Sequence, residues 1–175
     1  MTAGGWRTFI PVAVLVAVLA VAGYVVAAVN EPTNAASGET APTLRGEGLD
    51  GEPLDLTEVT ADVVLVNFWA SWCPPCEQEV DVLLEAERRY PDDQLAVLGV
   101  NSQDERGNAQ RAAEEWGADG YRNVFDGDGH IAVDWGVVGL PETFVVDADG
   151  KVLARHKGPV TREWLNETLD GLVSS

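Results

Sequence analysis

The sequence predicts an α/β domain with one core, in which helices cover both faces of a central mixed sheet. Two short apolar segments, 62–69 and 95–101, are each followed by an amphipathic helical pattern, which is typical of buried parallel strands joined by crossover helices. Two more strand-like segments flank a turn at 148–150, which indicates an antiparallel hairpin. With 175 residues and 46% apolar side chains, the chain is long enough for such a core.

The first half of the domain contains a hairpin, two strands and two helices. Residues 43–56 hold two short apolar pieces separated by glycines, which predicts a β-hairpin at the domain entrance. Apolar β-branched and aromatic residues run without interruption through 62–69 and 95–101, so both are expected to be buried strands. Helices are expected at 74–90 and 105–117, where apolar positions recur at helical spacing, and Gly117 would end the second one.

The second half contains shorter elements. A short strand is expected at 123–126 and a short helix at 129–136. Strands at 142–147 and 152–155 flank the hairpin turn. Thr161 would cap a last helix, which places Leu165, Leu169 and Leu172 on one face.

The N-terminal part of the chain differs from the rest in composition. Arg7 is the only charged side chain among the first 30 residues, and residues 9–29 are an uncharged apolar run. As a helix this run would span roughly 31 Å, close to the thickness of a bilayer core. An uncleaved transmembrane anchor is therefore expected. A cleaved signal peptide is the alternative, although its apolar region is usually about 7–15 residues.

Both alternatives place the domain outside the cytoplasm. Arg7 precedes the apolar run, while Glu31 and Glu39 follow it, so the positive-inside rule puts the N-terminus in the cytoplasm. The expected organisation is a cytoplasmic N-terminus (1–8), a single transmembrane helix (9–29), a flexible linker of small and polar residues (30–42) and an extracytoplasmic domain (43–175). The expected location is the cell membrane.

The charge balance excludes several partners. The chain carries 29 acidic and 11 basic residues, a formal net charge of −18. Nucleic-acid binding is not expected, because phosphate contacts need clustered Lys and Arg. Binding to an anionic membrane surface is disfavoured for the same reason.

The strongest chemical signal is Cys73-Pro74-Pro75-Cys76, where the first buried strand ends and the following helix begins. A thiolate attacks disulfides, and a helix N-terminus favours negative charge, so Cys73 is the predicted nucleophile. Cys76 lies one helical turn further on, close enough to form a disulfide with Cys73 and to resolve a mixed disulfide. Pro74 and Pro75 stiffen the turn with backbone angles already near helical values.

Two other interpretations of the cysteine pair stay open. A CxxC can be half of a zinc site, but zinc needs four ligands, and His130 and His156 do not lie at a known zinc spacing. A purely structural disulfide would close only a tiny loop, where the gain in loop entropy is smallest. A redox role is favoured, with no metal and no other cofactor expected.

The segment VNFWASWCPPCEQE, residues 66–79, strongly resembles the active-site segment of thioredoxin-like proteins. The segment GVVGLPETF, residues 136–144, resembles their cis-proline segment. Among thioredoxin-like proteins, the chain is similar to the membrane-anchored extracytoplasmic reductases of the DsbE/CcmG and ResA/TlpA groups, over roughly residues 43–173. The resemblance implies a thioredoxin-like fold and thiol-disulfide oxidoreductase activity.

The resemblance also implies roles for residues around the cysteines. Pro141 should follow a cis peptide bond, and Leu140 should present its backbone to an extended substrate. Trp72 should lie on the substrate-facing surface next to the nucleophile, with Pro74 and Pro75 beside it.

Two acidic residues match the same group, Glu79 after the CxxC and Glu142 after the proline. Thioredoxins usually have a buried Asp six residues before the first cysteine, but Asn67 stands there in this chain. Glu79 and Glu142 are therefore the candidate groups for proton transfer. The alternative, that each is a solvated surface residue, stays open.

The predicted function is a membrane-tethered thiol-disulfide reductase. Acidic residues at 77, 79, 81 and 142 would oppose the thiolate of Cys73 and shift the couple toward a reductant. By resemblance, the substrate is the disulfide of apocytochrome c or of a maturation partner, and a membrane thiol transporter of the CcdA/DsbD type supplies electrons. A general extracytoplasmic disulfide reductase and a non-enzymatic redox-sensing or interaction module are the alternatives.

Overall fold

The computed structural model describes residues 38–173. The predicted cytoplasmic N-terminus, the predicted transmembrane anchor and residues 30–37 of the predicted linker lie outside the described residues. Within residues 38–173, none of the helices has the length and apolar character needed to cross a bilayer.

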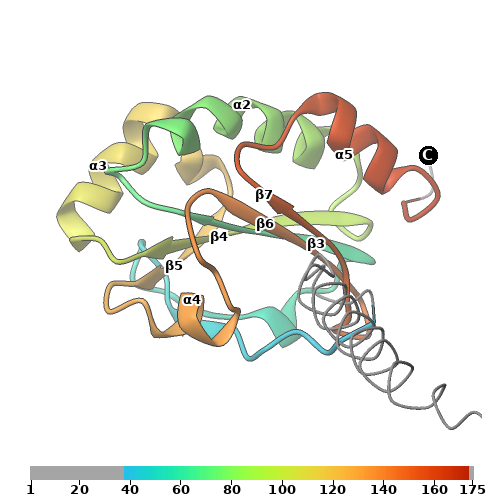
Figure 1. Cartoon of the computed structure of the whole chain (residues 1–175), viewed down its shortest axis with the longest axis horizontal. Helices are drawn as coiled ribbons and strands as arrows, with labels where there is room; N and C mark the ends of the chain where they lie inside the picture. The colour runs from blue at the N-terminus through green and yellow to red at the C-terminus, as the bar shows by residue number, and fades with distance from the viewer. Residues whose placement is uncertain (1–37, 174–175) are drawn as a thin grey trace, which may run out of the picture. The chain divides into compact units, whose positions relative to one another are not determined.

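A five-stranded mixed sheet forms the centre of the domain, in the order β5-β4-β3-β6-β7 (Figure 1). The strands β3 (Val63–Trp69), β4 (Leu95–Ser102) and β5 (Arg122–Asp126) are parallel. The strands β6 (Glu142–Asp147) and β7 (Val152–Lys157) form an antiparallel hairpin, and β6 pairs antiparallel with β3. The predicted mixed sheet is therefore confirmed.

Helices cover both faces of this sheet. Figure 1 shows α2 (Pro74–Arg89), α3 (Arg106–Trp116) and α5 (Arg162–Leu169) on one side and the short helix α4 (His130–Asp134) on the other. The predicted hairpin consists of β1 (Arg45–Glu47) and β2 (Pro53–Asp55), which pair antiparallel. Short 3-10 turns follow at Leu56–Glu58 and Ala118–Gly120.

The central strand β3 divides the core into two layers. All seven of its residues are buried. Because side chains alternate across a strand, Val63 and Leu65 pack into the layer that contains α2, while Val64, Val66 and Phe68 pack into the layer that contains α4. Burial on both faces explains why this segment is an uninterrupted apolar run.

The start and the end of the domain differ from the sequence-based expectation. Residues 38–42 were expected in a flexible linker, but the N–H groups of Gly38 and Ala41 donate to the carbonyls of Val152 and Gly150, at 3.0 and 2.8 Å. This part of the predicted linker is held against the end of the β6–β7 hairpin. At the other end, α5 stops at Leu169, so Leu172 leaves the predicted apolar face and is 40% exposed.

A buried amide fixes the end of β3 that leads to the cysteines. The indole Nε1 of Trp69 donates to Oδ1 of Asn123 at 2.8 Å. The Nδ2 of Asn123 in turn donates to the carbonyls of Ala118 and Tyr121 at 2.7 and 2.8 Å. With its hydrogen bonds satisfied, the buried amide ties the last residue of β3 to the segment before β5.

Candidate active site

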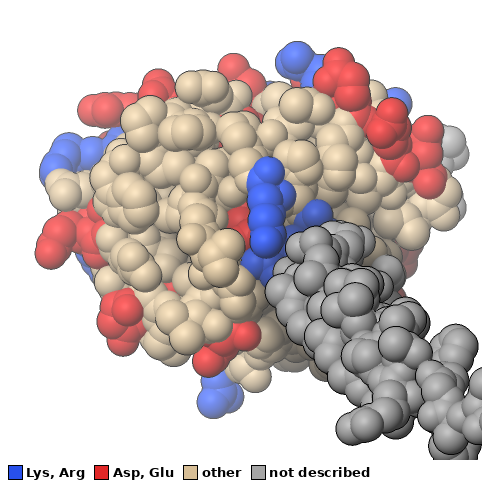
Figure 2. All heavy atoms as spheres, in the orientation of Figure 1, with Lys and Arg blue, Asp and Glu red and all other residues tan. Residues whose placement is uncertain are grey.

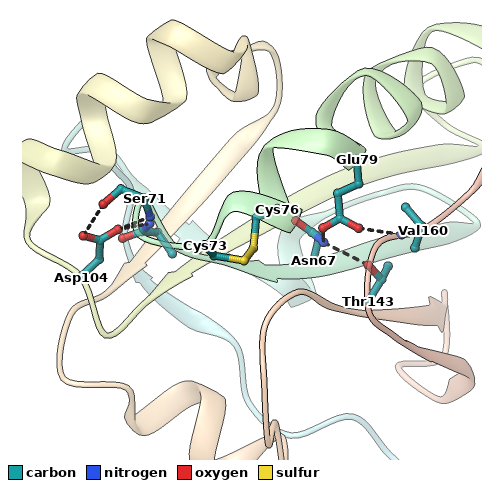
Figure 3. The surroundings of a disulfide bond; sticks show 9 residues. Asn67, Ser71, Cys73, Cys76, Glu79, Asp104, Thr143 and Val160 are labelled. Carbon is teal, nitrogen blue, oxygen red and sulfur yellow. Dashed lines mark hydrogen bonds between the residues drawn. A yellow bond between two sulfur atoms is a disulfide. The ribbon is translucent and has the colours of Figure 1, made fainter.

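The two cysteines form a disulfide at the N-terminus of α2 (Figure 3). Cys73 is the N-cap residue and the helix begins at Pro74, as the sequence predicts. Both cysteines are almost completely buried, with 3% and 1% of their surface exposed. Since β3 ends four residues earlier, the sheet places the disulfide at the carboxyl end of its parallel strands, where α/β domains commonly bind their ligands.

The proline segment lies beside the cysteines because β6 pairs with β3. Phe68 pairs with Glu142 in this register, so Pro141 lies next to the end of β3. The Leu140–Pro141 peptide bond is cis, as expected. The segments 66–79 and 136–144, far apart in the chain, therefore meet at one end of the sheet.

A hollow of about 180 Å³ lies beside Trp72, the residue before Cys73, and Leu140, the residue before Pro141. Trp72, which is 56% exposed, lines it together with Gln103, Val137, Val138 and Leu140. Figure 2 shows a broad uncharged area on this face of the domain, bordered by a column of Lys and Arg side chains near the middle of the view and by Asp and Glu side chains below it. The hollow beside Trp72 therefore offers uncharged, mostly apolar side chains and backbone to a binding partner.

Glu79 is buried and hydrogen-bonded, so it is not the solvated helix residue that stayed open as an alternative. Only 1% of its surface is exposed. Its carboxylate accepts from Nδ2 of Asn67 and from the N–H of Val160, both at 2.8 Å, and Asn67 also donates to Oγ1 of Thr143 at 3.0 Å (Figure 3). Burial raises the pKa of Glu79 to about 7, against the lowering effect of these two hydrogen bonds. The group therefore changes protonation state near neutral pH, one helical turn from Cys76.

Glu142 is also buried, but it is paired with the cationic side chain of Arg155, which no sequence pattern indicates. Its Oε1 accepts a short hydrogen bond from Nε of Arg155, and its Oε2 accepts from the N–H of Val138 at 3.4 Å. The Nη2 of Arg155 donates to the carbonyl of Gly136 at 2.7 Å. This arrangement contradicts the solvated alternative for Glu142. It also favours a positioning role over proton transfer, because both carboxylate oxygens support the loop before Pro141.

The Glu142–Arg155 ion pair changes the balance of charge expected around the cysteines. By sequence, Glu142 is one of the acids expected to oppose the thiolate, but Arg155 compensates its charge. Glu79 is the buried carboxyl near the cysteines that accepts only neutral hydrogen-bond donors. No sequence pattern pointed to Arg155, because its contact with Glu142 arises from the β6–β7 hairpin, in which Arg155 pairs with Phe144.

Both histidines have partners that the sequence did not reveal. Nδ1 of His130 lies next to the carboxylates of Asp128 and Asp126, and the hydrogen bond with Asp128 raises the pKa of the exposed imidazole. The carboxylate of Asp126 accepts the N–H groups of Ile131 and Ala132 at 3.0 and 3.1 Å, so it caps α4. His156 packs against the ring of Trp164, with 4.6 Å between centroids. These contacts account for the group formed by Asp126, Asp128 and His130 as local structure at the start of α4.

The fold and the site define a thioredoxin-like thiol-disulfide oxidoreductase. The chain belongs to the Redoxin family, which it matches over residues 36–172. It is 36% identical to the thiol:disulfide interchange protein HelX of Rhodobacter capsulatus over 171 residues, covering 95% of this chain and 94% of HelX. It is 32% identical to the thiol-disulfide oxidoreductase ResA of Geobacillus thermodenitrificans over 161 residues, covering 91% of this chain and 92% of ResA.

Comparison with a solved structure also shows similarity to thiol:disulfide interchange proteins. The chain superimposes on a candidate thiol:disulfide interchange protein DsbE from Chlorobium tepidum with a TM-score of 0.73 and 30% identity, covering 79% of this chain and 99% of the other. These relatives confirm the resemblance to the DsbE/CcmG and ResA/TlpA groups.

The titration of Glu79 predicts a specific pH dependence of stability. Because its pKa is raised from 4.5 to about 7, the folded protein binds the proton more tightly than the unfolded chain. The stabilising contribution of Glu79 to the free energy of unfolding is therefore fully present below about pH 4.5 and is lost as pH rises through about 7. Urea denaturation of Glu79→Gln and wild type should show their difference in unfolding free energy changing by on the order of 2–3 kcal/mol between pH 4.5 and pH 8. Glu77→Gln, on the exposed face of the same helix, is the control. A difference for Glu79→Gln that does not change with pH would contradict the assignment.

Arg155→Met tests the buried ion pair. The substitution leaves the charge of Glu142 buried without its partner, so the unfolding free energy should fall by about 3–5 kcal/mol. The double variant Arg155→Met/Glu142→Gln should recover a large part of this loss, because it removes the uncompensated charge. Arg162→Met is the matched control, since its pair with Glu85 is exposed and should contribute less than about 1 kcal/mol. Equal losses for the two arginines would show that Arg155 is not a buried partner of Glu142.

Proposed function

We propose that this chain is a membrane-anchored, extracytoplasmic thiol-disulfide reductase that acts on protein disulfides. The observation that carries the proposal is the Cys73–Cys76 pair at the N-terminus of α2, placed beside Pro141 and an exposed Trp72. The names of the relatives, thiol:disulfide interchange proteins, support exchange with other thiols and disulfides.

The reaction transfers two electrons to the client. The thiolate of Cys73 attacks one sulfur of the client disulfide, and a mixed disulfide forms while the other client sulfur leaves as a thiolate and takes up a proton. The thiolate of Cys76 then attacks the sulfur of Cys73. The second client cysteine leaves as a thiol, and the Cys73–Cys76 disulfide closes.

Glu79 is the proposed proton acceptor for this second step. A thiol must lose its proton before it attacks, and a group with a pKa near the working pH is an efficient base. Glu79 has such a pKa, and it lies one turn along α2 from Cys76. Val160 and Asn67 hold the carboxylate in place through hydrogen bonds.

The client is proposed to bind in an extended form across the hollow beside Trp72. Trp72 and Leu140 both line this hollow, and the exposed Pro74, two residues after Trp72, begins α2 and is followed by Pro75. We assign Trp72, Pro74, Pro75 and Leu140 to client binding.

The client and the electron donor are proposed from the resemblance to the DsbE/CcmG group. The client is the disulfide of apocytochrome c or of a maturation partner, and a membrane thiol transporter of the CcdA/DsbD type reduces the chain again. The uncharged run 9–29 would hold the domain (43–175) at the cell membrane through the linker (30–42), with residues 1–8 in the cytoplasm.

Trapping by Cys76→Ser identifies the client. The variant keeps the nucleophile but lacks the resolving thiol, so mixed disulfides with Cys73 should accumulate and be released by a reductant. Mass spectrometry of the trapped species should find apocytochromes c or their maturation partners. A broad set of unrelated clients would instead support a general reductase. If no client is trapped covalently, the proposal is overturned. Cys73→Ser/Cys76→Ser is the control for noncovalent capture.

The redox potential tests the direction of electron flow. We expect the Cys73/Cys76 couple to lie nearer to thioredoxin, at about −270 mV, than to the strong oxidant DsbA, at about −120 mV. At pH 8 the charge of Glu79 should oppose the thiolate, so Glu79→Gln should raise the potential by about 10–30 mV. Glu77→Gln should have a smaller effect, because its charge is exposed to solvent. Equilibration with glutathione or dithiothreitol measures these values, and a potential at the DsbA end would overturn the assignment as a reductant.

A further inference from the structure

The residues just before the nucleophile form a tight turn with little support of its own. The N–H of Cys73 donates to the carbonyl of Ala70 at 3.1 Å, so Ser71 and Trp72 are the two corners of this turn. Pro74 and Pro75 follow and provide no N–H groups. The orientation of Trp72 therefore depends on what holds the two corners from outside.

The carboxylate of Asp104 holds the first corner. Its Oδ2 accepts from the N–H of Ser71 at 2.6 Å and from Nδ2 of Asn101 at 3.0 Å. Its Oδ1 accepts from Oγ of Ser71 and from the N–H of Glu105, both at 2.8 Å. Each oxygen thus accepts two hydrogen bonds, and Ser71 supplies one donor to each (Figure 3). Hydrogen bonds to an ionised acceptor are shorter and stronger than those between neutral groups.

The carbonyl of Gln103 holds the second corner. It accepts from Nε1 of Trp72 at 2.9 Å. Gln103 has a φ of +53°, an uncommon conformation for a residue other than glycine, and it turns this carbonyl toward the indole. The other side of Gln103 rests on Gly129, where an added Cβ would come within 2.6 Å of its Cγ. The N–H of Gln103 donates to the carbonyl of Asp126 at 3.0 Å, so α4 and β5 support this conformation.

We propose that the Gln103–Asp104 segment, between β4 and α3, is a positioning element that sets Trp72 as one wall of the client-binding hollow. The inference deepens the proposed function, because it rests on contact between Trp72 and the client. Gln103 itself lines the hollow beside Trp72, so the same segment supports the wall and forms part of it. Asp104 is a positioning residue, since it acts through Ser71 and does not face the hollow.

This role predicts an effect on client binding rather than on the chemistry of sulfur. Asp104→Asn keeps the size of the side chain but places an amide against the donors of Ser71 and Asn101. The turn formed by residues 70–73 should then lose its fixed orientation. Because Trp72 would no longer be held in place, its contribution to client binding should be lost. The nucleophile itself remains held by α2 and by the end of β3.

Single-turnover kinetics separates the two effects. The probe is a synthetic extended peptide whose one cysteine is joined to a chromogenic thiol as a mixed disulfide, mixed with an excess of fully reduced protein. For Asp104→Asn, the half-saturating protein concentration should rise about tenfold, while the limiting rate should change by less than about threefold. For Ser71→Ala, which removes no charge, the pH profile of Cys73 alkylation should coincide with that of wild type.

Three comparisons make the result decisive. Asp55→Asn is the matched control, because Asp55 accepts the N–H and the hydroxyl of Thr57 at 2.9 and 2.8 Å, as Asp104 does from Ser71, but in β2. If Asp104→Asn fails to fold, Ser71→Ala should raise the half-saturating concentration, and Ser71→Thr, which keeps the hydroxyl, should recover most of that loss.

An unchanged half-saturating concentration, a shift equal to that of Asp55→Asn, or a fall confined to the limiting rate would overturn the positioning role. A wild-type protein that does not reduce the peptide at all would instead overturn the proposed function, and this inference would fail with it.

Discussion

The antiparallel pairing of β3 with β6 is the interaction on which the rest of the site depends. The cysteine segment follows the last residue of β3, and the cis-proline segment precedes the first residue of β6. Pairing of Phe68 with Glu142 brings these two ends together, although they are distant in sequence. β3 is buried on both faces, and a slip of one residue would exchange its two core layers, so packing fixes the register strongly.

A polar chain crosses the apolar core next to the disulfide. Through Asn67, the carboxyl of Glu79 on α2 connects to Thr143 on β6, and directly to the backbone of Val160 before α5. Burying a carboxyl costs stability unless it is protonated or well hydrogen-bonded, and here both the raised pKa and the donors are present. The fold thus buries a carboxyl with a raised pKa one helical turn from Cys76, where the proposed exchange reaction needs a group that can take up and release a proton.

The two walls of the hollow are held by different chemistry. Arg155 and the buried Glu142 hold the loop that leads to Pro141, from within the core. Asp104 and Gln103 hold the turn that leads to Cys73, from a partly exposed loop. The side chains that line this hollow carry no charge, although the chain has a net charge of −18. The proposed client contact there would depend on shape and apolar area.

The sequence by itself determined the order of strands and helices, the disulfide chemistry of Cys73 and Cys76 and the family, because periodicity and short motifs are local properties of a chain. It also named Glu79, but not its burial. Only the tertiary structure decided that Glu142 is paired with Arg155, that residues 38–42 belong to the fold, and that Asp104 supports the turn at Ser71. These contacts join residues brought together by strand pairing and loop packing, and no local pattern encodes which distant side chain or backbone group will meet which.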